Sequence, residues 1–173
     1  MRLKKKVALI TGATGGMGRA EAKLFAKEGA FVVIAARKEE LGKKLVDDIM
    51  EDGGTALFVQ LDVSEQEQWA EAVKQVKEQF GALHILVNNA GTNAPALLPK
   101  VDMDIWNKVF ATNVTGTLLG IETCAPLMRA SGGGSIVNIG SIGGMTANFS
   151  TAYSSSKWAL RGVSGSAAYN LAG

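Results

Sequence analysis

Two residues that can move a proton stand four positions apart near the end of the chain. Tyr153 and Lys157 enclose the run Tyr-Ser-Ser-Ser-Lys, which lies in a helical pattern. Residues at i and i+4 share one helix face, with Cβ atoms about 5–6 Å apart. A free tyrosine titrates near pH 10, and a lysine cation beside it favours the ionised form. The spacing therefore indicates a tyrosine that exchanges a proton with a bound molecule, although the pattern alone is common by chance.

A glycine cluster near the start of the chain indicates a site for phosphate groups. Gly12, Gly16 and Gly18 follow an apolar run and open a helical pattern. Such a turn lets a ligand approach the backbone, and the helix behind it presents free N–H groups and the positive end of its dipole. A pyrophosphate suits this geometry. Thr14 and Met17 of the same loop are predicted to contact it.

Arg37 follows the second predicted strand, where dinucleotide-binding folds usually carry an acid for the ribose 2′-hydroxyl. An arginine there predicts contact with a 2′-phosphate, and the alternative is a surface arginine. Asp62 and Val63 follow the third predicted strand. The Asp62 carboxylate either caps the next helix or binds an adenine amino group, and the spacing favours neither.

The two remaining strand exits are also polar. Asn88, Asn89, Ala90 and Gly91 follow the fourth predicted strand. The asparagines either satisfy backbone groups of the loop or contact the ribose of an adenosine. Ser141 follows the fifth predicted strand and is the third candidate for the chemistry of Tyr153 and Lys157.

The rest of the sequence supplies the elements that position these residues. Apolar runs predict strands at 6–11, 31–36, 56–61, 83–87 and 135–139, and helical patterns lie at 16–29, 39–52, 64–80, 102–130 and 151–171. Ser64, with Glu67 three residues later, predicts a capping box at the third helix. Strands that alternate with helices predict an α/β fold with a doubly wound parallel sheet and helices on both faces. Ligands bind such sheets at the carboxyl ends of the strands, so all the candidate residues should meet at one edge.

Composition restricts the class of protein. The chain has 173 residues, 47% of them hydrophobic and 20% charged, which favours one globular domain. The net charge is +2 with scattered basic residues, and no apolar stretch is long enough for a membrane span. We therefore expect a cytoplasmic protein without nucleic-acid or membrane partners. Cys124 is the single cysteine, and His84, the single histidine, lacks a partner pattern, so no disulfide or metal site is expected.

Taken in order, these motifs resemble those of the short-chain dehydrogenase/reductase family. The residues that carry the resemblance are Thr11–Gly18, Asp62-Val63, Asn88–Gly91, Asn113, Ser141 and the run from Tyr153 to Lys157. The resemblance covers essentially the whole chain, and the ordered set is far more specific than any one member. It implies a Rossmann fold and NAD(P)-dependent transfer of a hydride between a nicotinamide and a ketone or secondary alcohol.

The resemblance also implies a role for each residue. Tyr153 would be the general acid or base, and Lys157 would hold the nicotinamide ribose and favour ionisation of the tyrosine. Ser141 would bind the substrate carbonyl oxygen, and Asn113 would bind a water of the proton relay behind Lys157. The predicted cofactor contacts are Gly12, Thr14, Gly16, Met17, Gly18, Arg37, Asp62, Val63, Asn89, Ala90, Gly91, Tyr153 and Lys157.

The predicted cofactor is NADP because of Arg37. NAD is the alternative, since Gly15 stands where phosphate-preferring relatives often carry a basic residue. The segments around Gly143–Met145, Asn148-Phe149 and Thr92–Leu98 are mostly small or apolar, which suggests a neutral ketone or alcohol of modest size. Reductases of carrier-bound 3-oxoacyl groups and dehydrogenases of sugars or cyclic alcohols stay open.

Members of the family continue beyond the point that corresponds to Gly173, with further strands and a substrate-covering segment. The resemblance therefore implies that this chain is a fragment, and a nucleotide-binding module with little turnover is the alternative function. Relatives usually pair through two long helices, which here carry Trp106 and Trp158. A homodimer or homotetramer is expected of the longer protein.

Overall fold

Two strands without a polar face form the middle of the sheet. The computed structural model describes residues 1–146 and 150–172, and within them β1 (Val7–Thr11) is buried along its whole length. β2 (Phe31–Ala36) is buried after its first residue. A parallel strand is this apolar when helices cover both faces of its sheet.

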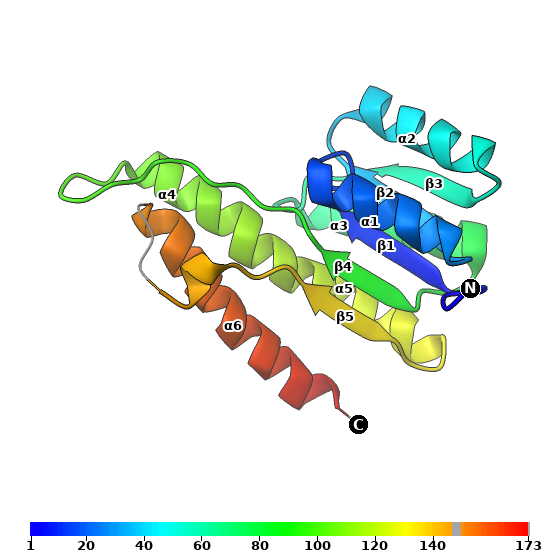
Figure 1. The fold of residues 1–173 in the computed structure, drawn as a ribbon. Coiled ribbons are helices and arrows are strands. Elements are labelled where there is room, and N and C mark those ends of the chain that lie inside the picture. The colour runs from blue at the N-terminus through cyan, green and yellow to red at the C-terminus, as the bar shows by residue number, and fades with distance from the viewer. Residues whose placement is uncertain (147–149, 173) are drawn as a thin grey trace.

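All the strands of the described chain are parallel and belong to one sheet (Figure 1). Its order is β3-β2-β1-β4-β5. The other strands are β3 (Thr55–Gln60), β4 (Ile85–Asn88) and β5 (Ser135–Asn138). The chain therefore winds outward from β1 in both directions, and the switch point lies between β1 and β4. The predicted α/β fold, with a doubly wound parallel sheet, is confirmed and is a Rossmann fold.

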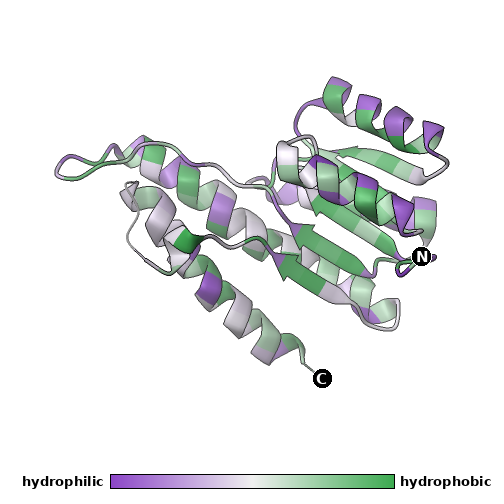
Figure 2. Cartoon of the chain, viewed as in Figure 1, coloured by the Kyte–Doolittle hydropathy of each residue, from purple (hydrophilic) through white to green (hydrophobic). Residues whose placement is uncertain are grey.

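Helices cover both faces of this sheet. α1 (Gly16–Lys27) and α2 (Glu39–Glu51) pack on one face around Ile10, Ile34 and Leu45. α3 (Gln66–Phe80) and α5 (Gly116–Ala130) pack on the other. Hydrophilic and hydrophobic stretches alternate along α1 and α2, whereas the strands in the middle of the sheet are hydrophobic (Figure 2).

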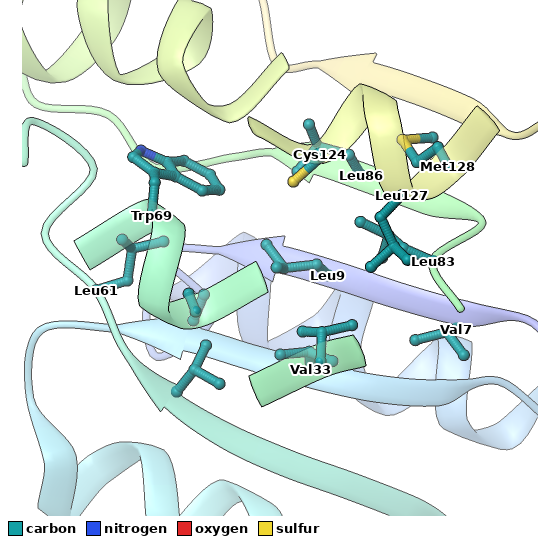
Figure 3. Packing of buried hydrophobic residues seen from close by; sticks show 14 of the residues in the cluster. Val7, Leu9, Val33, Leu61, Trp69, Leu83, Leu86, Cys124, Leu127 and Met128 are labelled. Atoms are coloured by element: carbon teal, nitrogen blue, oxygen red, sulfur yellow. The ribbon is translucent and has the colours of Figure 1, made fainter. Parts of the chain in front are cut away.

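The larger core lies between the sheet and the helices α3 and α5. Trp69 is completely buried and donates its indole N–H to the Val63 carbonyl over 2.9 Å. Figure 3 shows Trp69 and Cys124 above Leu9 and Val33 of the sheet. Burial raises the pKa of the Cys124 thiol to about 12, so this cysteine is a packing residue.

One long helical rod follows the loop after β4. It consists of α4 (Met103–Phe110), the π-turn η1 (Ala111–Thr115) and α5. α6 (Thr151–Leu171) runs beside this rod (Figure 1). A short 3-10 turn, η2 (Ile142–Gly144), lies between β5 and α6.

The predicted capping box is wrong. α3 begins at Gln66, its N-cap is Glu65, and no side chain caps it. Ser64 instead donates its backbone N–H and its hydroxyl to Asp62 Oδ1, over 3.1 Å and 2.8 Å. The Asp62 carboxylate closes a turn before the helix. Because Ser64 is bound in this turn, its hydroxyl does not cap the N-terminus of α3.

Candidate active site

The glycine loop between β1 and α1 has little room for side chains. Gly12 has a φ of +62°, and a Cβ there would lie 2.9 Å from the Ala90 Cα atom. A Cβ on Gly18 would lie 2.6 Å from both the Gly12 oxygen and Asn89 Nδ2. Gly16, by contrast, faces open space, and no side chain caps the helix that begins there. The first turn of α1 can therefore receive an anion at its N–H groups.

Asn89 ties this loop to the exit of β4. Its side-chain Nδ2 donates to the carbonyls of Thr11 and Gly12, over 2.9 Å and 3.3 Å. The Thr11 hydroxyl oxygen accepts the N–H groups of Asn89 and Ala90, each over 3.0 Å. The sequence left two alternatives for Asn89. This geometry supports the one in which its amide hydrogen-bonds to backbone groups of the loops. Contact of Asn89 with a cofactor stays a prediction.

A cleft of about 400 Å³ opens at the carboxyl edge of the sheet. The cleft is lined by residues that the sequence predicted for a cofactor, namely Gly12, Thr14, Arg37, Asp62, Val63, Ala90 and Gly91. Gly16, Met17, Gly18 and Asn89 are not among its lining residues, and Met17 is mostly exposed. Sequence reasoning missed Lys38, Leu41, Lys108 and Thr112, which also line it, whereas Thr92 belongs to the segment predicted beside the substrate.

The charges around this cleft favour an anionic ligand. Arg37, Lys38 and Lys108 line it, whereas Asp62 is the acid among its lining residues. Arg37 Nη1 lies 3.8 Å from Asp62 Oδ2, and the arginine side chain is 71% exposed. An exposed ion pair of this kind is weak, so the guanidinium can turn to a ligand phosphate at little cost.

Lys157 lies next to Tyr153 and close to Gly91, although neither Lys157 nor Tyr153 is among the residues that line the cleft. Its Nζ is 5.8 Å from the centre of the Tyr153 ring and donates to the Ile139 carbonyl over 2.6 Å. The residue is only 6% exposed, and burial lowers the pKa of its ammonium group. An ammonium has three donors, so the Ile139 bond uses one of them. A Cβ on Gly91 would lie 3.9 Å from the Lys157 Nζ, so the glycine leaves that side of the ammonium open.

Asn113 is buried inside the π-turn. Its Nδ2 donates to the Thr92 carbonyl over 3.0 Å and to Ser156 Oγ over 2.9 Å. Its Oδ1 accepts the Thr92 N–H over 2.8 Å. The carboxamide therefore connects the loop after β4 with α6, a contact that the sequence did not predict. π-Turns are frequent at functional sites, and the predicted water of the proton relay stays a prediction.

Ser141 is half-buried directly before η2. Its Oγ accepts the Gly143 N–H over 3.0 Å. A Cβ on Gly144 would lie 2.6 Å from the Lys157 carbonyl oxygen, so this turn packs against the backbone of α6. The structure thus brings the Ser141 turn to the helix that carries Tyr153 and Lys157. Asn148 and Phe149, predicted beside the substrate, lie outside the described residues.

The described part of the chain contains no group of three or more His, Cys, Asp or Glu side chains that could hold a metal ion. None of its helices is long and apolar enough to cross a membrane.

A parallel sheet with a glycine loop and a positively charged cleft at its switch point defines a Rossmann-type α/β protein. The profile of the short chain dehydrogenase family matches residues 6–173. This chain therefore belongs to the short-chain dehydrogenase family, whose members use NAD(P).

Named relatives agree with this assignment. A 2,5-dichloro-2,5-cyclohexadiene-1,4-diol dehydrogenase of Sphingobium indicum is 44% identical over 168 residues, which cover 96% of this chain and 67% of the relative. A trans-4-hydroxycyclohexanecarboxylate dehydrogenase of Sinomonas cyclohexanicum is 40% identical, with 98% and 68% covered. A 7alpha-hydroxysteroid dehydrogenase of Clostridium sardiniense is 41% identical, with 94% and 63% covered.

A solved structure has the same fold. The crystal structure of a short-chain type dehydrogenase/reductase from Mycobacterium marinum superimposes with a TM-score of 0.94 at 32% identity. The match covers 98% of this chain and 70% of that chain. The chain thus spans about two thirds of the length of the relatives it matches.

Proposed function

We propose that this chain is the cofactor-binding and proton-transfer part of an NADP-dependent dehydrogenase of secondary alcohols. The observation that carries the proposal is the buried Lys157 beside Tyr153, next to Gly91, which lines a cleft with cationic walls. In the proposed reaction Tyr153 gives a proton to the carbonyl oxygen of a ketone, or takes it from the alcohol in reverse.

The residues of the cleft fit the proposed cofactor. Gly16 and the uncapped start of α1 suit a pyrophosphate, and Lys157 has donors left for ribose hydroxyls. Arg37 suits a 2′-phosphate, and the end of β2 carries no acid that would repel one. When bound, the nicotinamide supplies or accepts the hydride.

The residues of the chain would then perform the proton half of the reaction. Lys157 stabilises the tyrosinate with its positive charge, and the Ser141 hydroxyl binds and orients the substrate oxygen. Asn113 bonds to Thr92 of the loop after β4 and to Ser156 of α6. These bonds fix the position of Tyr153 relative to the cleft.

Relatives support a cyclic substrate. Their names specify a cyclohexadienediol, a hydroxycyclohexanecarboxylate and a hydroxysteroid. In this chain, exposed apolar side chains near the Ser141 turn, Ile142 and Met145, favour a neutral ring over a sugar. We therefore propose a cyclic secondary alcohol and its ketone as the substrate pair.

Tyr153→Phe tests the proposed function. General acid–base catalysis contributes about 10²- to 10⁴-fold, so kcat for NADPH-dependent reduction of cyclohexanone should fall by that factor. NADPH affinity, measured by titration, should be unchanged. Tyr169→Phe is the matched control, because Tyr169 lies on the same helix and is 87% exposed. Undiminished turnover by Tyr153→Phe would refute the role of Tyr153. NADPH binding without any turnover by the unmodified chain would favour the nucleotide-binding module.

A further inference from the structure

Three hydrogen-bond donors on one face of α6 hold the loop that leaves β5. Ser154, Lys157 and Arg161 stand at i, i+3 and i+7, so they point to the same side of the helix. Each of them donates to a main-chain carbonyl within residues 139–146. Lys157 belongs to the proposed proton transfer, whereas the other two have no part in it so far.

The two outer donors bind the turn η2 itself. Ser154 Oγ donates to the Gly143 carbonyl over 2.8 Å, and Arg161 Nη1 donates to the Gly144 carbonyl over 3.2 Å. We call Ser154 and Arg161 the α6 clasp. The guanidinium of Arg161 lies 5.1 Å from the centre of the Trp158 ring, a cation–π contact that limits its freedom.

The clasp reaches the Ser141 hydroxyl through Gly143. Gly143 donates its N–H to Ser141 Oγ and accepts the Ser154 hydroxyl at its carbonyl, so it is bound on both sides. Gly144 packs against the α6 backbone at Lys157, and its carbonyl accepts a hydrogen bond from Arg161. Movement of the turn away from α6 would therefore move the Ser141 hydroxyl as well.

We propose that Ser154 and Arg161 are positioning residues that fix the Ser141 hydroxyl relative to Tyr153 without touching the substrate. This inference rests on the proposed function, in which Ser141 binds the substrate oxygen. Without the clasp, Lys157 would be the one of these three donors that still binds the loop, and in the proposed function Lys157 also binds the cofactor ribose. The clasp thus leaves the donors of the Lys157 ammonium available for the reaction.

The experiment compares Ser154→Ala and Arg161→Ala with the unmodified chain. Amide hydrogen exchange of Gly143 and Gly144 should become about 2- to 10-fold faster, the range expected for the loss of one net hydrogen bond. The kcat for ketone reduction should fall by a similar factor while NADPH affinity stays constant. Ser154→Thr and Arg161→Lys retain a donor and should restore part of both effects.

Two control variants separate the clasp from general damage. Ser135 is exposed at the start of β5, and Arg2 is exposed next to the N-terminus, so Ser135→Ala and Arg2→Ala should change neither readout. The inference is overturned if amide exchange of Gly143 and Gly144 is unchanged in both clasp variants. It is also overturned if this exchange becomes faster while kcat is unchanged. The exchange measurement needs no turnover, so it decides the clasp even where Tyr153→Phe disproves the proposed function.

Discussion

Lys157 divides its hydrogen bonds between the fold and the proposed ligand. One donor binds the Ile139 carbonyl over 2.6 Å, and Gly91 keeps space beside the ammonium. Burial lowers the pKa of this lysine, so a hydrogen-bond acceptor or a negative charge brought close to it would favour the ammonium form. A tyrosinate or a phosphorylated cofactor would supply such charge.

At the same scale, Arg37 should select between the two nicotinamide cofactors. We expect Arg37→Ala to weaken NADP binding by about tenfold or more, because a charge-assisted contact to the 2′-phosphate is lost. NAD lacks this phosphate and should bind with unchanged affinity. Titration of both cofactors measures the effect, with Lys43→Ala, an exposed cation of α2, as the control. Equal losses for NAD and NADP would show that Arg37 is a surface residue.

Single residues were predictable where a motif fixed both type and spacing. Tyr153, Lys157 and Ser141 were named in this way, and the structure places them on α6 and on the turn packed against it. Lys108 and Ser156 were missed. Their positions depend on how the rod and α6 pack together, which no local pattern encodes.

At the scale of elements, His84 joins the start of β1 to β4. Its Nδ1 accepts the Val7 N–H over 3.0 Å, so this bond requires a neutral imidazole. Burial, together with the charge of Lys6, lowers the pKa of His84 in the folded protein. The folded state then binds fewer protons than the unfolded state as pH falls through the unfolded value near 6.5. The stabilisation is therefore complete above that pH and is lost below it.

We expect the free energy of unfolding to fall by up to about 1 kcal/mol between pH 7.5 and pH 5.5 because of His84. Chemical denaturation at both pH values measures the change. His84→Gln offers an acceptor that does not titrate, and this variant should show a smaller loss. An equal loss in both proteins would assign the pH dependence to other groups.

Glu21 on α1 is a second partly buried titratable group. Its Oε2 atom is buried, and no partner for it occurs among the described residues. Burial raises the pKa of this carboxyl, so the ionised form is penalised as pH rises through the raised folded value. Glu21→Gln should therefore stabilise the chain by about 1 kcal/mol at pH 7, and by less at pH 4. Thermal unfolding at both pH values tests this, with the exposed Glu78→Gln as the control. Lower stability of Glu21→Gln at pH 7 would contradict the argument.

The elements themselves could be predicted from the sequence to within one or two residues in most cases. The apolar runs of β1 and β2 and the glycines that end α1 and α3 are strong local signals. The predicted start of α3 was wrong because Asp62 binds Ser64, which was expected to cap the helix. The π-turn around Asn113 has no sequence signature. The first feature is a local competition between two neighbouring side chains, whereas Asn113 is held by contacts with other elements.

At the scale of the whole molecule, an apolar groove lies between α5 and α6. It has a volume of about 770 Å³, and its lining includes Leu118, Ile121 and Val163. Glu122 and Arg129 also line it, seven residues apart on α5. Antiparallel packing of two copies would place Glu122 of each copy opposite Arg129 of the other. We therefore propose that this groove forms a homodimer contact.

Leu118→Asp should disrupt such a dimer, because it places an unpaired charge in the contact. A loss of about 2 kcal/mol or more in association free energy is expected for a central residue. Size-exclusion chromatography with light scattering measures the dimer fraction. Leu24→Asp is the control, since Leu24 is 49% exposed on α1 and Leu118 is 50% exposed. A chain that is monomeric before any substitution would refute the proposed contact.

The π-turn makes room for one residue more than the α-turn it replaces. Its i→i+5 bond, from the Gly116 N–H to the Ala111 carbonyl, closes a wide turn, and the helix continues on both sides of it. Deletion of one residue between Ala111 and Thr115 can therefore be absorbed by a return to an α-turn, so that α5 keeps Ile121 and Cys124 in the core. The Asn113 carboxamide would instead lose the wide turn that places it between Thr92 and Ser156. A single deletion in this turn is thus expected to damage the site more than the fold.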